Sequence, residues 1–221
     1  MKSRRIPEET VARLPLYVDA LRRFAAQGVV ITSSRELSEA SGSNPAQLRK
    51  DLSYLGDFGT PGIGYEVSTL LSQLSRHLGL NRLWRVGIVG FGKLGSALAS
   101  YGGFHERGFE VVAIFDNDPK KVGQRVGDVR VIDIQELASV ARELELDIGV
   151  ITTPAAAAQQ ALNQLVAGGV RSVLSFSPIA LAAPPHVTVR RMDLAREMQI
   201  LSFYEVLNVN RELQRLMREE V

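Results

Sequence analysis

A glycine-rich turn in the middle of the chain limits the possible folds more than any other feature. Its sequence is Gly90-Phe91-Gly92-Lys93-Leu94-Gly95, and it connects an apolar stretch, 84–89, to a helical stretch, 94–100. In such a strand–turn–helix the first glycine permits the tight turn, the second lets the backbone approach a pyrophosphate, and the third lets the helix pack closely on the strand. The pattern predicts a dinucleotide site at the N-terminus of the helix.

An acidic residue lies where such a site needs one. Asp116 ends a second apolar stretch, 111–115, and is 21 positions after Gly95. Its carboxylate can accept hydrogen bonds from ribose hydroxyls and would repel a 2′-phosphate, so NAD(H) is favoured over NADP(H), although Lys120 and Lys121 keep NADP(H) open. Two further alternatives stay open at this point: a mononucleotide or CoA-type fold with the same first turn, and a sheet that has lost its ligand.

Strand and helix patterns alternate from residue 83 onward. Strands are predicted at 84–89, 111–115, 129–132, 148–151 and 170–176, and helices at 94–100, 134–145, 155–167 and the C-terminus. Strands that alternate with helices form a parallel sheet with helices on both faces. The second part of the chain is therefore predicted to be a Rossmann-type doubly wound α/β sheet, followed by a C-terminal helix.

The first part of the chain is helical and contains a glycine-rich tip. Helices are predicted at 11–27, 34–41, 46–55 and 68–80, with the tip at 56–65 between the third and the fourth. This order is typical of a winged helix-turn-helix, in which the last helix before the wing enters the major groove of DNA. The third helix is therefore the candidate recognition helix.

The candidate recognition helix has one apolar and one polar face. Leucines at i, i+4 and i+7 share the face that is expected to be buried: Leu48, Leu52 and Leu55. The opposite face carries side chains of the types that bind base edges and phosphates: Gln47, Arg49, Lys50, Ser53 and Tyr54. Further DNA contacts are expected at the start of the second helix and at the tip: Ser33, Ser34, Gly62 and Gly64. The alternative interpretation is an ordinary amphipathic helix with a solvated face.

Charge and composition exclude several classes of protein. The net charge is +2, and residues 1–80 hold 10 Lys+Arg against 8 Asp+Glu while 81–221 hold 16 of each, an excess too small to indicate DNA binding by itself. With no cysteine, a disulfide framework, a thiolate nucleophile and Cys-ligated zinc are excluded. No apolar run approaches the roughly 18 residues that span a bilayer. No membrane contact and a cytoplasmic location are therefore expected.

An enzyme acting on a dinucleotide would need a proton donor or acceptor near the reacting group. The three histidines, His77, His105 and His186, have no partner at a telling spacing, so no catalytic residue and no metal site are predicted. NAD bound without chemistry indicates sensing. An NAD-dependent oxidoreductase with a helical N-terminal domain is the alternative, and a CoA- or nucleotide-binding scaffold is a third interpretation.

Five short motifs occur along the chain in an order that is far more specific than any one of them. They are 49–56, 62–65, 78–80, the glycine turn with Ser96-Ala97-Leu98, and Asp116-Asn117-Asp118-Pro119. Together they resemble the redox-sensing transcriptional repressor Rex family of bacteria over nearly the whole chain. The resemblance implies a homodimer that binds an inverted-repeat operator in double-stranded DNA when NAD+ is high and releases it when NADH binds.

The resemblance also implies roles for two loops and a switch. The loops lie at the carboxyl edge of the sheet and are expected near the nicotinamide: Thr152-Thr153-Pro154 and Phe176-Ser177-Pro178. In the family, a tyrosine, an acid and an arginine pair to form a switch, and Tyr101 and Asp193 match the tyrosine and the acid. The C-terminal helix of the family is exchanged between subunits. Asp19 stands where the pairing has an arginine, and Pro61 stands where the wing usually carries a basic residue.

These observations predict three parts and one function. The parts are a winged helix-turn-helix DNA-binding domain at 1–79, a Rossmann NAD(H)-binding domain at 80–198 and a dimerisation helix at 199–221. The expected function is that of a repressor whose affinity for its operator is lowered by NADH.

Overall fold

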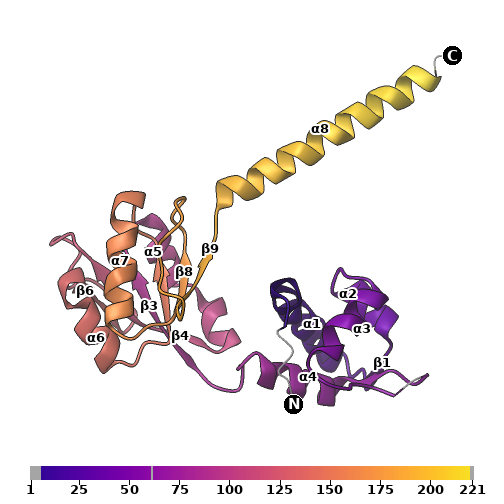
Figure 1. Cartoon of the computed structure of the whole chain (residues 1–221), viewed down its shortest axis with the longest axis horizontal. Coiled ribbons are helices and arrows are strands. Elements are labelled where there is room, and N and C mark those ends of the chain that lie inside the picture. The colour runs from indigo at the N-terminus through magenta and orange to yellow at the C-terminus, as the bar shows by residue number, and fades with distance from the viewer. Residues whose placement is uncertain (1–5, 61, 220–221) are drawn as a thin grey trace. The chain divides into compact units, whose positions relative to one another are not determined.

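The computed structural model describes residues 6–60 and 62–219 and forms two compact units, Met1–Leu83 and Trp84–Val221. The first unit is mainly helical (Figure 1). Its elements are, in chain order, α1 (Glu8–Ala26), β1 (Ile31–Thr32), α2 (Ser34–Ala40), α3 (Pro45–Ser53), β2 (Tyr65–Glu66) and α4 (Val67–His77). The two short strands pair antiparallel, with Ile31 opposite Glu66 and Thr32 opposite Tyr65.

One apolar core holds the helices of the first unit together. Side chains from α1, α2, α3 and α4 form it: Leu14, Tyr17, Val18, Leu21, Leu37, Leu48, Leu52, Leu70 and Leu74. The helix starts are set by local hydrogen bonds, since Ser33 and Glu36 form a capping box at α2. At α3 the Asn44 side chain accepts the Gln47 N–H, and Pro45 occupies the first turn. The predicted winged helix-turn-helix order is present.

The second unit is built on a seven-stranded sheet. Its strands are β3 (Trp84–Val89), β4 (Phe109–Asp116), β5 (Arg125–Val126), β6 (Val129–Asp133), β7 (Ile148–Ile151), β8 (Ser172–Ser175) and β9 (Thr188–Arg191). They lie in the order β5-β6-β4-β3-β7-β8-β9, and all neighbours are parallel except β5 and β6. The chain winds outward in both directions from β3, so the switch point lies between β3 and β7.

Helices cover both faces of this sheet. The second unit contains α5 (Lys93–Ala99), η1 (Gly102–Arg107), η2 (Ile134–Glu136), α6 (Leu137–Glu143), α7 (Ala155–Ala167) and α8 (Leu194–Glu219). Residues of α6 and α7 share one core cluster with Phe115 and Ile151 of the sheet. Residues Leu98 and Ala99 of α5 pack on the other face, against Ile88. The predicted doubly wound α/β fold is confirmed.

Several elements of the second unit differ from the sequence-based expectation, including the two short helices η1 and η2. The edge strand β9 and the short strand β5 were not predicted, because neither has an apolar periodicity along its few residues. The long helix α8 begins at Leu194, five residues before the expected start of the C-terminal part, because the carboxylate of Asp193 accepts the N–H of Arg196 at 3.2 Å and caps it.

Candidate functional site

The glycine turn after β3 is closely packed on two sides and open on the third. Gly90 has φ +101°, and a Cβ there would lie 3.0 Å from the Thr153 nitrogen. A Cβ on Gly95 would lie 1.9 Å from the carbonyl oxygen of Gly90, so α5 can approach the turn only without a side chain. A Cβ on Gly92 would meet nothing within 4 Å. Gly92 therefore leaves free space on its outer side, where backbone can approach a ligand.

Neighbouring strands hold the turn in place. The Gly90 N–H donates to the Phe115 carbonyl oxygen at 2.7 Å, which ties the turn to the end of β4. From the other side, the Thr152 hydroxyl donates to the carbonyl oxygen of Gly90 at 2.7 Å. The turn is thus held by hydrogen bonds from both sides within the protein itself, and such preorganisation lowers the entropic cost of binding.

Asp116 lies beside the turn, at the carboxyl end of β4, and is only 5% exposed. Its carboxylate accepts the Phe91 N–H at 2.6 Å, the Asp118 N–H at 2.9 Å and the Lys121 ammonium at 3.2 Å. Burial by itself raises the pKa of a carboxyl group, but these three donors outweigh it and hold the pKa of Asp116 below its ordinary value. The residue is a fixed negative charge that also shapes the turn.

Two loops follow β7 and β8 at the same edge of the sheet. The N–H of Phe176 donates to the carbonyl oxygen of Ile151 at 2.9 Å, so the two loops start side by side. Thr153 and Ser177 are the second residues after the paired strand ends Ile151 and Ser175. Their hydroxyl oxygens are buried and have no hydrogen-bond partner among the described residues. The outer residues of these loops, Pro154 and Pro178, are exposed.

The predicted recognition helix presents only part of its polar face to solvent. Arg49, Lys50 and Ser53 are exposed, and the Arg49 guanidinium donates to the Ser34 hydroxyl at 3.0 Å. Ser53 instead donates its hydroxyl to the Lys50 carbonyl oxygen at 2.7 Å. Tyr54, the residue that follows α3, is half-buried. Arg49 and Ser34 therefore form one connected polar surface, while the Ser53 hydroxyl is engaged within its own helix.

A buried carboxylate on the inner side of α3 was missed by the sequence analysis. Asp51 is fully buried and accepts hydrogen bonds from three residues of α1. These are Thr10 at 2.9 Å, Tyr17 at 2.7 Å, and Arg13, which donates through Nε at 2.6 Å and Nη2 at 2.9 Å. Burial alone would raise the pKa of this carboxyl group. The hydrogen-bond donors outweigh burial and lower the pKa to about 2.

Gln47 belongs to the same cluster. Its side-chain amide donates to Asp51 at 2.8 Å, across one turn of α3. The amide is therefore engaged inside the protein rather than presented with Arg49. Gln47 was predicted to face DNA, and the structure places it half-buried at the border of that face.

The wing folds back on the start of α2. Thr60 and Gly64 pair across the tip, with the Thr60 N–H donating to the Gly64 carbonyl oxygen at 2.9 Å. A Cβ on Gly64 would lie 2.4 Å from the Thr32 carbonyl oxygen, so this glycine is needed for packing, whereas Gly62 is open. Pro61 lies outside the described residues.

An open groove of about 750 Å³ separates the wing from α3. Many of its lining residues are those predicted to contact DNA: Ser33, Ser34, Arg49, Ser53, Gly62 and Gly64. Within it, the Ser33 hydroxyl is occupied by the capping box, at 2.9 Å from the Glu36 carboxylate. The groove thus unites residues from three separate segments of the chain.

The two predicted switch residues do not touch each other within the chain. Tyr101 is 57% exposed and packs edge-on against Phe104, with ring centroids 5.2 Å apart. Asp193 caps α8, as described above, and no hydrogen bond or ion pair of the described residues joins it to Tyr101. Asp19 lies 4.0 Å from Arg22 of the same helix.

Two general findings limit other classes of site. Within residues 6–60 and 62–219, no helix combines the length and the apolar character that a membrane span requires. Over the same residues, no three His, Cys, Asp or Glu side chains are grouped in a way that could hold a metal ion.

Comparisons with known proteins match both units. A family described as CoA binding domain matches residues 81–179, and one described as putative DNA-binding protein N-terminus matches residues 5–53. The redox-sensing transcriptional repressor Rex of Streptomyces coelicolor is 52% identical over 204 residues, which cover 92% of this chain and 79% of the relative. That of Desulfitobacterium hafniense is 43% identical over 203 residues, covering 92% and 97%.

Solved structures agree with these relatives. The crystal structure of RSP in complex with beta-NAD+ and operator DNA has a TM-score of 0.87 and 33% identity, and covers 98% of this chain and 99% of its own. RSP in complex with beta-NADH has a TM-score of 0.84 and 31% identity, with coverage of 96% and 99%. RSP is itself named a Rex-family repressor.

The names of these relatives decide between the interpretations of the sequence. They are named as repressors, so the oxidoreductase alternative is not favoured. The predicted fold and the resemblance to the Rex family are confirmed. The chain belongs to the redox-sensing transcriptional repressor Rex family.

Proposed function

We propose that this chain represses transcription in the cytoplasm by binding operator DNA through its first unit, and that NADH bound to its second unit releases the DNA. The observation that carries the proposal is that one chain combines a rigid, outwardly open glycine turn with a groove between a recognition helix and a wing. Similarity to RSP, which has been crystallised with NADH and with NAD+ and operator DNA, supports the same pairing of ligands.

The glycine turn fits a dinucleotide. Gly92 leaves space for the pyrophosphate, and Asp116 offers a fixed carboxylate to the adenosine ribose. Two loops lie on the other side of the switch point. The loop after β7 contains Thr152, Thr153 and Pro154, and the loop after β8 contains Phe176, Ser177 and Pro178. Bound NAD(H) would supply a ligand whose ring charge and shape change with the redox state.

On the DNA side, the surface formed by Arg49, Lys50 and Ser34 fits the major groove. Arg49 can reach base edges or phosphate, and Lys50 neutralises phosphate. The exposed tip residue Gly62 permits close approach of the wing. Gln47 and Ser53 each use one donor hydrogen within the protein, and their side-chain oxygens can still accept hydrogen bonds from DNA.

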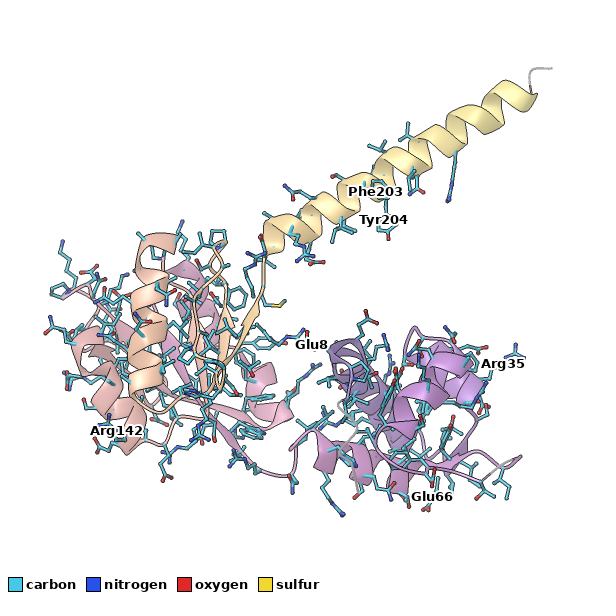
Figure 2. All side chains as sticks on the ribbon, viewed as in Figure 1. Glu8, Arg35, Glu66, Arg142, Phe203 and Tyr204 are labelled. Carbon is cyan, nitrogen blue, oxygen red and sulfur yellow. The ribbon has the colours of Figure 1, made fainter. Side chains whose placement is uncertain are left out.

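We also propose that α8 joins two copies of the chain. The proposed division is a DNA-binding domain at 1–79, an NAD(H)-binding domain at 80–198 and a dimerisation segment at 199–221. Large apolar side chains of α8 are exposed: Leu194, Met198, Leu201, Phe203, Tyr204, Val206 and Val209. Figure 2 shows Phe203 and Tyr204 projecting from the helix, and they are 61% and 56% exposed. A second copy of the helix would cover such an apolar surface.

A dimer explains how a small ligand can release DNA. Two recognition helices must match half-sites at a fixed spacing of one helical turn or a multiple of it. If NADH favours a dimer with a different spacing, one helix loses its contacts. A coupling of about 1–3 kcal/mol per ligand changes operator affinity about 5-fold to 150-fold. NADH and NAD+ must therefore bind the two states with different affinities.

The decisive experiment is a titration of the full chain against the operator DNA that was co-crystallised with RSP. At fixed salt, the affinity is expected to fall at least fivefold when NADH replaces NAD+ at saturating concentration. Fluorescence anisotropy of labelled DNA measures this change. Equal affinity with both cofactors would contradict redox sensing, and release by CoA instead would support the CoA-binding scaffold.

The same titration tests the DNA surface. Arg49→Ala is expected to weaken operator binding about tenfold, because a direct contact to a base or phosphate is worth about 1–3 kcal/mol. NADH affinity should not change. Arg142→Ala is the matched control, because Arg142, labelled in Figure 2, is an exposed arginine on α6 of the second unit. It donates to the Ala167 carbonyl oxygen. An unchanged operator affinity for Arg49→Ala would contradict the assignment of α3 as recognition helix.

Asp116 and Lys121 together are expected to set the preference for NAD(H) over NADP(H). In Asp116→Ser the Lys121 ammonium, now 3.2 Å from the carboxylate, is released to meet a 2′-phosphate. NADH affinity should fall about tenfold or more, since a hydrogen bond to a charged group is worth about 1.5–3 kcal/mol, while NADPH affinity rises. Isothermal titration with both cofactors measures the ratio.

The double variant is the control for this preference. Asp116→Ser combined with Lys121→Ala should bind NADH as weakly as Asp116→Ser but lose the gain for NADPH. If the double variant keeps the gain, Lys121 does not contact the 2′-phosphate.

A further inference from the structure

Asp51, the buried carboxylate of α3, can only accept hydrogen bonds. Its Oδ1 accepts the Gln47 amide at 2.8 Å, from one turn earlier on the same helix. The two oxygens of Asp51 also accept four hydrogen bonds from Thr10, Arg13 and Tyr17 of α1. With a pKa of about 2, the buried group is ionised at neutral pH and has no hydrogen to donate.

This property of Asp51 decides which end of the Gln47 amide faces inward. Since the carboxylate only accepts, the amide nitrogen must point to it, and the amide oxygen is turned away. The oxygen of Gln47 is not among the buried side-chain oxygens that lack a partner, and no donor of the described residues binds it. Gln47 therefore presents a hydrogen-bond acceptor to solvent.

The place of Gln47 on α3 is one from which a recognition helix reads bases. Gln47 is the third residue of the helix, and its backbone N–H donates to the Asn44 side chain at 2.9 Å, which fixes the first turn. In helix-turn-helix proteins, residues near the N-terminus of the recognition helix contact base edges in the major groove. The outward oxygen of Gln47 is thus available to a base.

The bases differ in what they offer to such an acceptor. In the major groove, adenine and cytosine carry an exocyclic amino group, which donates, whereas guanine and thymine offer carbonyl oxygens, which only accept. An amide that is free to rotate could pair with either kind of group. An amide whose nitrogen is held by a buried carboxylate selects a base with an amino group.

We infer that the Gln47 oxygen accepts a hydrogen bond from the exocyclic amino group of an adenine or a cytosine in the operator, and that Asp51 is the residue that positions it. The inference rests on the proposed function and adds to it the chemical group that one residue recognises. Arg49 has the opposite character, since its guanidinium only donates and suits guanine or phosphate. The two residues therefore require different groups of the same operator.

Base analogues that lack the amino group test the inference on the full chain in the presence of NAD+. In the operator that was co-crystallised with RSP, each adenine is replaced in turn by purine and each cytosine by 2-pyrimidinone. At one position of each half-site, the wild type is expected to bind about three- to tenfold more weakly, because one hydrogen bond is lost. The analogue that causes the loss identifies the base. Fluorescence anisotropy measures each affinity.

Gln47→Met removes the amide and leaves a side chain of similar length. The loss at that one position is expected to disappear in this variant, because the amino group no longer has a partner. Both proteins are measured on the same two DNA molecules, so any weakening of the duplex by the analogue cancels. Arg49→Ala is the matched control and should show the same loss at this position as the wild type.

Asp51→Asn tests the positioning role under conditions in which the variant is folded. The amide of an asparagine can donate as well as accept, so it no longer dictates the direction of the Gln47 amide. We expect this variant to show a smaller loss than the wild type at the identified position. An undiminished loss would contradict the role given to Asp51.

Two further results would overturn the inference. If Gln47→Met keeps the loss at every position, Gln47 binds no amino group. If Gln47→Met instead becomes insensitive to 2-aminopurine in place of guanine, an analogue without the guanine carbonyl oxygen, the amide donates to that oxygen and is turned the other way. In both cases the proposed function stands as long as NADH releases the operator from the wild type. If the wild type does not bind the operator at all, the proposed function itself fails.

Discussion

Asp51→Ala is expected to destabilise the N-terminal unit by about 3 kcal/mol, because removing one partner of a buried ion pair leaves the other charge and its donors unpaired. The Tyr17 hydroxyl, on a fully buried side chain, loses its acceptor at 2.7 Å. Arg13 is 26% exposed and can turn toward water, which places the loss at the lower end of the range of about 3–5 kcal/mol. Urea denaturation of the full chain, followed by circular dichroism, measures the change.

The same substitution is expected to weaken operator binding at least tenfold under conditions in which the variant is folded. Asp51 is the polar connection between α1 and α3, through Thr10, Arg13 and Tyr17, so its loss lets the recognition helix shift on the core.

The pKa of Asp51 in the folded state, about 2, lies below the ordinary value of 3.8. The stabilisation by this carboxylate is therefore fully present above about pH 4 and is lost as the pH falls toward 2.

A surface ion pair is the matched control. Glu39→Ala removes the partner of Arg35, which Figure 2 labels on α2. The side chains of Glu39 and Arg35 are 64% and 81% exposed and 2.9 Å apart. Such pairs contribute about 0–1 kcal/mol because water screens them. Equal destabilisation by Glu39→Ala and Asp51→Ala would contradict the central role of the buried carboxylate.

The Asp51 cluster shows what sequence patterns could not predict. The apolar periodicity of Leu48 and Leu52 identified the buried face of α3, and Asp51 lies on it, three residues after Leu48. Its partners on α1 are 34 to 41 positions away, however, and no local pattern indicates them. An acid on an apolar helix face is the signal that could have found the cluster. The bond from the Gln47 amide to Asp51 could not be predicted for the same reason, and the contact of Gln47 with DNA stays a prediction.

Local signals were sufficient elsewhere. The glycine turn depends on residues within a few positions of one another, and the structure contains it as predicted. The acid at 116 was also found, but its ties to Phe91 and Lys121 depend on the packing of the turn against β4. The exposed edge strand β9 had no apolar pattern to reveal it. Sequence thus predicted the elements better than the hydrogen bonds between them.

Two glycines of the same turn are expected to separate ligand binding from folding. Gly92→Ala should leave the free energy of unfolding within about 1 kcal/mol, because Gly92 has φ −85° and a Cβ there meets nothing within 4 Å. NADH affinity should nevertheless fall at least tenfold, since the methyl group occupies the space that the pyrophosphate needs. Thermal denaturation and isothermal titration of one preparation measure both quantities.

Gly95→Ala should lose both properties. Its Cβ would lie 1.9 Å from the Gly90 carbonyl oxygen and 2.8 Å from the Thr152 hydroxyl, so α5 must move away from the turn. Overpacking of this kind costs about 1–3 kcal/mol, and the displaced turn no longer matches the ligand. Gly102→Ala, whose Cβ also meets nothing within 4 Å, is the control outside the turn and should change neither property.

The contrast between the two variants is the informative result. If Gly92→Ala binds NADH like the wild type, the open side of the turn does not face the pyrophosphate, and the ligand must approach the sheet from elsewhere. If Gly92→Ala loses stability as Gly95→Ala does, the space beside Gly92 is filled in solution. Loss of NADH binding at full stability would instead mean that the space is kept free for the ligand, because no contact within the protein requires a glycine at position 92.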